Sequence, residues 1–160
     1  MSELSHIDPA GRARMVDVTD KAQTSRVAGA EGQLICARAT LDLVARGEAP
    51  KGAVIQTAEL AGVMAAKRTI DLIPMCHPLA LTGIDVRIAP DADLPGFRVT
   101  ASVRTTGQTG VEMEALTAVG VACLTLFDML KAVDRTMTID GIRVTRKSGG
   151  RSGEWSAVPA

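Results

Sequence analysis

Hydrophobic and polar positions along this chain follow helical and strand-like periods, and the longest regular pattern runs from Gly107 to Lys131. On a helical wheel its apolar positions form one stripe: Leu116, Val119, Cys123, Phe127 and Leu130. A turn ending at Gly110 precedes the pattern, and Thr109 followed three residues later by Glu112 predicts a capping box. The stretch therefore predicts one long amphipathic helix.

The polar side of this predicted helix carries Glu114, Val121, Thr125 and Asp128, with Lys131 at its edge. Glu114 and Asp128 share that face but lie about 21 Å apart along the axis, at ~1.5 Å of rise per residue. No single small ligand could touch both carboxylates on one chain. If both serve one small-ligand site, two copies of the chain must build it.

The other periodic segments predict a strand–helix–helix–strand–strand–helix–strand order. We expect a strand at 26–38, a helix at 40–46 closed by Gly47, a helix at 51–72 ended by Pro74 and Pro78, strands at 79–89 and 97–104, and a last strand through Ile142, Val144 and Arg146. The turn PDADLPG joins the two middle strands into a hairpin. This order is the split βαβ pattern of an α+β protein. It predicts an α+β sandwich, an antiparallel four-stranded sheet with helices packed on one face.

We expect one domain over residues 1–160, with an irregular N-terminal arm at 1–25 and a Gly-rich C-terminal tail at 148–160. Eighteen basic and eighteen acidic residues cancel, and the only aromatic residues are Phe97, Phe127 and Trp155. This composition argues against nucleic-acid binding, which uses basic surfaces and stacking platforms.

We expect neither a signal peptide nor a membrane span in this sequence. The start has no apolar run typical of a signal peptide, and we expect no membrane-spanning segment of ~18 uncharged apolar residues. Cys36, Cys76 and Cys123 are odd in number and widely spaced. They indicate reduced thiols in a cytoplasmic protein rather than a disulfide framework or a cysteine zinc site.

The basic residues gather at predicted helix ends and Gly-rich turns, where point charges and backbone amides can together bind an oligophosphate. They are Lys51, Lys67, Arg68, Lys131, Arg146, Lys147 and Arg151. Taken singly, each is better explained by the helix dipole or by surface solvation, and Lys67 can pair with Asp71. The segment KSGGRSG at 147–153 is either an anion-binding nest or a flexible tail, with little to separate the two.

Four side chains suit proton transfer or nucleophilic chemistry. His77, in a Pro-bounded loop, is either a proton-transfer group or a structurally satisfied histidine, and the neighbouring Cys76 is either a nucleophile or a packed thiol. Asp128 and Lys131, at i and i+3, form either a surface ion pair or an acid–base pair in which each group shifts the pKa of the other. A metal site has little support, because the other histidine is His6 in the arm and no HxH or HxxxH spacing occurs.

Three longer runs of sequence are more informative about function than these separate motifs. KGAVIQTAELAGVMAAKRTIDLIPMCHPL, TGQTGVEMEALTAVGVACLTLFDMLKAV and KSGGRSG, with the opening HIDPAGRARMVDV, resemble the cyclic pyranopterin monophosphate synthase (MoaC) family over nearly the whole chain. The resemblance implies a ferredoxin-like subunit in a homohexamer, a trimer of dimers with active sites at the dimer interface. It implies a lyase of molybdenum cofactor biosynthesis that converts (8S)-3′,8-cyclo-7,8-dihydroguanosine 5′-triphosphate, made by an upstream radical-SAM GTP cyclase, to cyclic pyranopterin monophosphate and pyrophosphate.

The resemblance also assigns roles to residues of this chain. It implies catalytic roles for Asp128, Lys131, Lys51 and His77, and substrate binding by Met75, Cys76, His77, Met113, Glu114, Lys67, Lys147 and Arg26. No cofactor is firmly implied by the resemblance, Mg²⁺ could accompany the triphosphate, and no protein-bound metal is expected. Two other classes stay open on the residues alone: a regulatory nucleotide-binding module and a purely structural oligomer.

Overall fold

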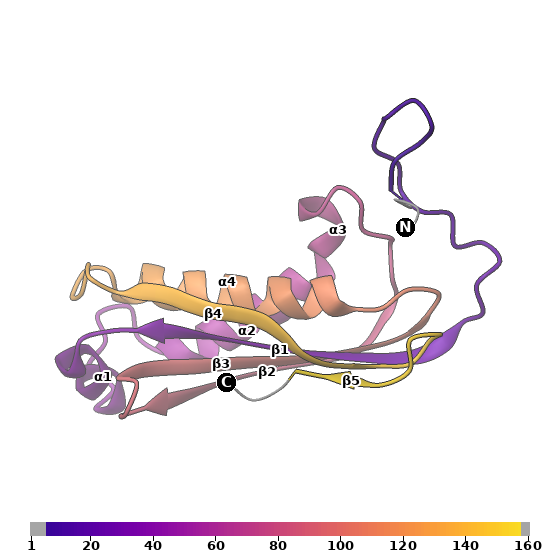
Figure 1. The fold of residues 1–160 in the computed structure, drawn as a ribbon. Helices are drawn as coiled ribbons and strands as arrows, with labels where there is room; N and C mark the ends of the chain where they lie inside the picture. The colour runs from indigo at the N-terminus through magenta and orange to yellow at the C-terminus, as the bar shows by residue number, and fades with distance from the viewer. Residues whose placement is uncertain (1–5, 158–160) are drawn as a thin grey trace.

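One antiparallel sheet with helices on one face forms the body of the molecule (Figure 1). The structure is a computed structural model that describes residues 6–157. Its elements, in chain order, are β1 (Thr24–Ile35), α1 (Arg38–Ala45), α2 (Val54–Lys67), α3 (Thr69–Leu72), β2 (Leu81–Asp91), β3 (Gly96–Gly107), α4 (Glu112–Leu130), β4 (Thr138–Ser148) and β5 (Trp155–Ser156). The predicted α+β, ferredoxin-like architecture is confirmed.

The strands lie in the order β2-β3-β1-β4-β5, and every neighbouring pair is antiparallel. The sheet therefore has one strand more than the predicted four. Gly149 and Gly150 have positive φ angles of 93° and 71°, a backbone region that favours glycine, and they turn the chain back after β4. Trp155 then pairs with Lys147. The segment predicted as a possible flexible tail is thus a hairpin over the residues described.

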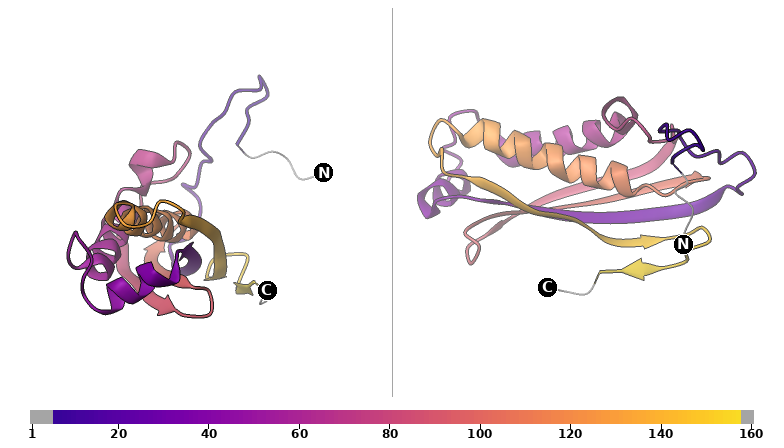
Figure 2. Two further views of the ribbon diagram at one scale, coloured as in Figure 1. Left: turned by 90° about the vertical axis from the view of Figure 1, so that its left-hand side faces the viewer. Right: turned by 45° about the horizontal axis from the view of Figure 1, so that its top comes forward.

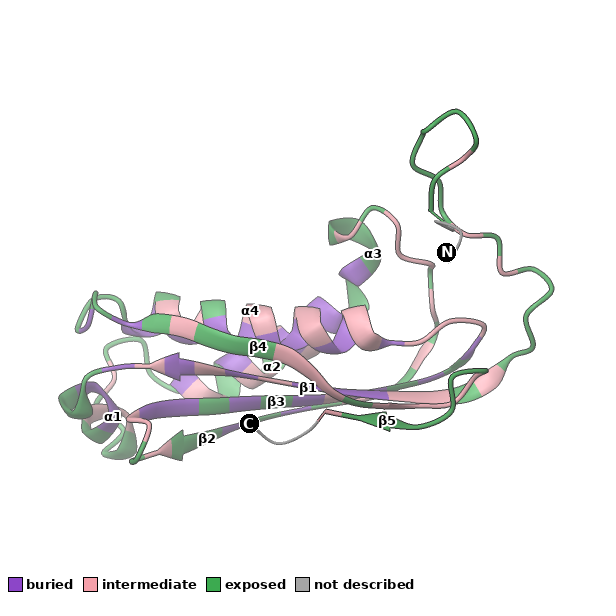
Figure 3. Cartoon of the chain, viewed as in Figure 1, coloured by how far each residue is buried: buried purple, intermediate pink, exposed green. Residues whose placement is uncertain are grey.

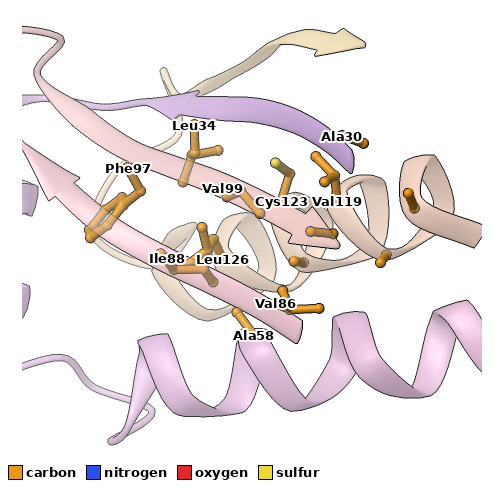
Figure 4. Close-up of a cluster of buried hydrophobic side chains, with 14 of the residues drawn as sticks. Ala30, Leu34, Ala58, Val86, Ile88, Phe97, Val99, Val119, Cys123 and Leu126 are labelled. Atoms are coloured by element: carbon orange, nitrogen blue, oxygen red, sulfur yellow. The ribbon is translucent and has the colours of Figure 1, made fainter. Parts of the chain in front are cut away.

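The core lies between the sheet and the two long helices, α2 and α4, which cover the same face (Figures 1 and 2). Along β3 the side chains alternate, and those facing the helices are buried: Phe97, Val99, Ala101, Val103 and Thr105. Figure 3 shows this alternation along the strands. In Figure 4, Leu126 and Cys123 of α4 point toward Val99 and other strand side chains. The period-2 pattern of the sequence therefore places the core correctly.

Small residues allow α2 and α4 to pack closely. A Cβ atom at Gly62 would lie 2.9 Å from the backbone oxygen of Ala118, so this position has no room for a side chain. Lys51, just before α2, meets Asp128 near the end of α4, so the two helices run antiparallel. This arrangement decides which charged residues share an end of the molecule.

The structure corrects several predicted element boundaries. The helix predicted at 51–72 is interrupted at Arg68, where φ is −109°, and α2 begins only at Val54. Lys51 therefore lies in the turn before a helix and does not open it. The strand predicted to reach residue 38 ends at Ile35.

The buried side of α4 is wider than its predicted stripe. Leu116 and Phe127 are only half-buried, while the interior face includes Ala115, Ala118 and Ala122. Because α4 packs against the sheet and α2 together, alanines between the two contacts are enclosed as well. By length and composition α4 is apolar enough to cross a membrane, although it carries Glu114 and Asp128 and so is not an uncharged stretch. Half of that apolar stretch is buried within the chain, as in a core helix.

Candidate functional site

The residues assigned to a site fall into two groups at opposite ends of α4. Near its C-terminal end lie Lys51, Asp128 and Lys131, here called the lysine–aspartate cluster. Near its N-terminal end a cavity brings together Met75, Cys76, His77, Met113 and Glu114, here called the α4 N-terminal site. The 14 positions between Glu114 and Asp128 correspond to about 21 Å of helix. One chain therefore keeps the two groups apart, as the helical spacing predicted.

The lysine–aspartate cluster is a pair of ion pairs that share one carboxylate. The Nζ atom of Lys51 lies 2.7 Å from Oδ2 of Asp128, and the Nζ atom of Lys131 lies 2.7 Å from Oδ1. Lys51 also donates a hydrogen bond to the Asp128 backbone carbonyl, at 3.0 Å. The proximity of Asp128 and Lys131 was predicted from their spacing. The contact with Lys51 depends on how α2 packs on α4.

Hydrogen bonds from Lys131 and from Lys51, reinforced by their positive charges, lower the pKa of Asp128 to about 2. The carboxylate stays ionised throughout the neutral range. A proton acceptor works best when its pKa is near the working pH, so Asp128 in this single-chain geometry is a weak base. The cluster is better suited to holding two ammonium groups at a fixed point, where they can neutralise phosphate charge.

The α4 N-terminal site is a cavity of about 220 Å³. The loop Met75–Leu79 and the turn at Thr109 and Gly110 cover the first turn of α4 there. They bury Glu114, which is only 5% exposed although its helix face was predicted to be polar. That expectation was wrong because the covering loop comes from a distant part of the chain. Burial first, and then the charge of Glu112, raise the pKa of the Glu114 carboxyl.

The thiol of Cys76 lines the same cavity and is half-buried. Burial, with a smaller contribution from the charge of Glu114, raises the pKa of the Cys76 thiol. A nucleophilic cysteine needs its thiolate form, which positive surroundings favour and burial disfavours. The geometry therefore supports the interpretation of Cys76 as a packed thiol that lines the cavity.

Glu112 does not form the predicted capping box. The N-cap residue of α4 is Val111, and no side chain caps the helix there. Instead, the carboxylate of Glu112 lies over Gly110 and accepts a hydrogen bond from Nζ of Lys147, at 3.0 Å. A side chain at position 110 would collide with that carboxylate. The ion pair adds Lys147, at the end of β4, to the α4 N-terminal site.

Arg26 and Lys67 extend the positive charge at this end of the molecule. The Nε atom of Arg26 donates to the Gly107 carbonyl at 2.9 Å, and Arg26 lines a cavity of about 610 Å³ beside Gly150 and Arg151. Lys67 is exposed at the end of α2, which points toward the N-terminal end of α4 because the helices are antiparallel. Among the described residues it makes no ion pair with Asp71.

His77 connects the site to the N-terminal arm. Its Nε2 atom lies 2.6 Å from the backbone carbonyl oxygen of Val16. Gln108, in the turn before α4, donates from its side-chain nitrogen to the Thr19 and Lys21 carbonyls. Sequence reasoning missed Val16 and Gln108, because an irregular arm has no hydrophobic periodicity from which its contacts could be predicted.

The residues that the structure describes contain no group of three or more His, Cys, Asp or Glu side chains placed to hold a metal ion. The charged groups at both ends of α4 are instead carboxylates paired with lysines. Their chemistry is that of anion binding and proton transfer.

Comparison with known proteins gives one consistent result. The MoaC family model matches residues 15–150. A protein from Methylobacterium sp. (strain 4-46) is 61% identical over 160 residues, all of both chains, and one from Methylobacterium nodulans is 59% identical over the same span. A protein from Brucella ovis is 60% identical over 154 residues, 96% of this chain and 93% of its own. All three are named cyclic pyranopterin monophosphate synthase.

Proposed function

The chain belongs to the MoaC family, and we propose that it catalyses the reaction for which its relatives are named, the synthesis of cyclic pyranopterin monophosphate. The observation that carries the proposal is identity of about 60% over essentially the whole length of each relative. The chain is then a lyase of molybdenum cofactor biosynthesis. Its substrate is (8S)-3′,8-cyclo-7,8-dihydroguanosine 5′-triphosphate, supplied by an upstream radical-SAM GTP cyclase, and the second product is pyrophosphate.

The charges of the two groups fit the demands of this reaction. Pyrophosphate gains negative charge as it leaves, and fixed ammonium groups stabilise such charge without reorganising. Ion pairs with Asp128 fix the ammonium groups of Lys51 and Lys131, and an ion pair with Glu112 fixes that of Lys147. Ring opening and closure require proton transfers, for which the imidazole of His77 is the candidate group. Mg²⁺, where it takes part, would arrive with the triphosphate.

Each active site in this proposal is shared by two subunits. The α4 N-terminal site of one subunit and the lysine–aspartate cluster of another would together surround one substrate, because one chain separates them by about 21 Å. Exposed apolar side chains on α2 and α4 support association with a second copy: Leu60, Met64 and Leu124 are 61%, 51% and 60% exposed. The assembly expected from the family is a homohexamer, a trimer of dimers, in the cytoplasm.

The test is turnover of the cyclised dihydro-GTP, with pyrophosphate and pyranopterin followed together. Wild type should release both products, and Asp128→Ala should lose turnover while its oligomer stays intact. Asp85→Ala is a matched control, because Asp85 pairs with Arg87 on the sheet and has a side-chain exposure of 53%, against 55% for Asp128. Binding without product from wild type would instead identify a regulatory nucleotide-binding module.

A further inference from the structure

His77 lies between two cavities that the fold builds on either side of its loop. One is the cavity of about 220 Å³ in the α4 N-terminal site. The other, of about 470 Å³, is formed with arm residues 15–19. His77, Leu79 and Thr109 line both. His77 therefore lines the candidate substrate pocket while its imidazole contacts the arm.

The contact with the arm fixes which ring nitrogen carries the hydrogen. The Nε2 atom lies 2.6 Å from the carbonyl oxygen of Val16, and a carbonyl oxygen only accepts hydrogen bonds. Nε2 must therefore be the donor. In a neutral imidazole the other nitrogen, Nδ1, then carries the free lone pair. Within residues 6–157, Nδ1 has no hydrogen-bond partner that would occupy it.

The arm is held at this place by the turn that also forms the pocket. The Nε2 atom of Gln108 donates to the carbonyls of Thr19 and Lys21, at 3.2 Å and 3.0 Å. The carboxylate of Asp17 accepts hydrogen bonds from the backbone N–H and the hydroxyl of Thr19. These bonds stiffen the arm between Val16 and Thr19. Gln108 precedes Thr109 and Gly110, two residues of the pocket wall.

We infer that arm residues 16–21, anchored by Gln108, form a positioning segment that holds His77 as the Nε2–H tautomer and leaves Nδ1 as its proton-accepting atom. The catalytic part of this inference rests on the proposed function. A substrate X–H group transfers its proton to Nδ1, and the bonding electron pair stays on X. The resulting imidazolium keeps its Nε2–H bond to Val16. The proton later returns from Nδ1 to the rearranged product, so the ring ends as it began.

The test uses the full-length protein labelled with ¹⁵N-histidine, observed by long-range ¹H–¹⁵N correlation under mildly alkaline conditions. Only two histidines are present, so His6→Gln assigns the signals. Wild type should show His77 protonated at Nε2, with slow exchange of that proton with water. Gln108→Leu keeps the bulk but removes both donors to the arm, and should speed this exchange about tenfold as the arm opens locally.

Asp8→Ala is the matched control. Asp8 accepts hydrogen bonds from Ala10 and Arg12 and orders the tip of the arm, away from His77. Its removal should leave the exchange of the His77 proton unchanged. An Nδ1–H tautomer in wild type would overturn the inference, and equal exchange in Gln108→Leu and wild type would overturn the role of the arm.

Activity separates this inference from the proposed function. If both hold, Gln108→Leu lowers kcat about tenfold or more with little change in KM, because a misplaced catalytic group loses rate before affinity. A wild-type protein with the expected tautomer and no turnover would refute the proposed function alone. An active enzyme whose kcat is insensitive to Gln108→Leu would refute the catalytic part of the inference.

Discussion

The two ends of α4 hold carboxylates in opposite electrostatic states. Asp128 lies in solvent contact between two ammonium groups, and its pKa falls to about 2. Glu114 is 5% exposed, and burial raises the pKa of its carboxyl. Both residues belong to one helix and nearly one helical face. Their pKa values shift in opposite directions because different segments surround the two ends of α4. Their positions on the helix alone would not produce this difference.

This contrast has a chemical meaning for the proposed reaction. The lysine–aspartate cluster offers fixed charge and little capacity to exchange protons, which suits the phosphates. The α4 N-terminal site offers a buried acid and a half-buried thiol and imidazole, which suit the rings. The cluster supplies no group suited to proton exchange, and the α4 N-terminal site adds only the charge of Lys147. A shared site would combine them, and the following experiments test that division of roles.

The largest effect is expected from neutralising the cluster's centre. Asp128→Asn keeps the shape but releases Lys51 and Lys131, and should lower kcat about 10²–10⁴-fold. Pyrophosphate release under saturating substrate measures it, with the oligomer size checked by light scattering. The matched exchange Asp85→Asn should leave kcat unchanged. Full activity of Asp128→Asn would remove the cluster from the reaction.

Mixed oligomers test whether the two ends belong to one site. Glu114→Gln and Asp128→Asn subunits, each inactive alone, are refolded together in equal amounts. If sites are shared across a two-fold interface, random pairing should restore about a quarter of wild-type activity, because half of the dimers are mixed and each has one intact site. A mixture as inactive as its parents would mean that every chain is self-sufficient.

Asp134 tests how much the turn after α4 contributes to the stability of the fold. Its carboxylate accepts hydrogen bonds from Ala37 N–H and the Thr40 hydroxyl, and from the N–H and hydroxyl of Thr136. This network ties the turn after α4 to the start of α1. Asp134→Ala leaves several donors without a partner and should lower the free energy of unfolding by about 2–3 kcal/mol, measured by urea titration.

The pH dependence gives a second readout for Asp134. The Ala37 backbone N–H, foremost among its hydrogen bonds, lowers the pKa of Asp134 from 3.8 to about 2. A lowered pKa stabilises the fold above the unfolded-state value, and this contribution disappears as the pH falls toward 2. The stability difference between wild type and Asp134→Ala should therefore shrink between pH 4 and pH 2. A difference constant over that range would show that the charge of Asp134 is not what stabilises the turn.

Sequence reasoning was most successful where a local period decides the structure. Alternation along residues 97–104 and the order of elements were enough to predict an antiparallel sheet, one strand short of the observed five, and its core face. Local motifs were less reliable. Thr109 and Glu112 have the spacing of a capping box, but Lys147 offers Glu112 a charged partner and the cap does not form.

The site was predictable only in part, for a related reason. The i,i+3 spacing of Asp128 and Lys131 anticipates their contact, because one helix sets the distance. The contact with Lys51 and the burial of Glu114 depend on segments far away in the chain. The family resemblance supplied these residues where periodicity could not. Tertiary packing, absent from any local pattern, determined their charge states.

The smallest effect, and the sharpest test of the contrast, concerns Glu114 itself. Because its pKa in the folded chain lies above 4.5, the folded state binds the proton more tightly than the unfolded state does. Stability is then greatest at low pH and falls as the pH rises through the folded pKa. Glu114→Gln has no such charge to bury and should be more stable than wild type by about 1 kcal/mol at neutral pH. The gain should vanish near pH 4. Thermal unfolding at both pH values measures it, and Glu112→Gln serves as the control because Glu112 is less buried and paired with Lys147. A variant less stable than wild type at neutral pH would mean that Glu114 is stabilised as a carboxylate, and the two ends of α4 would then differ in exposure but not in charge.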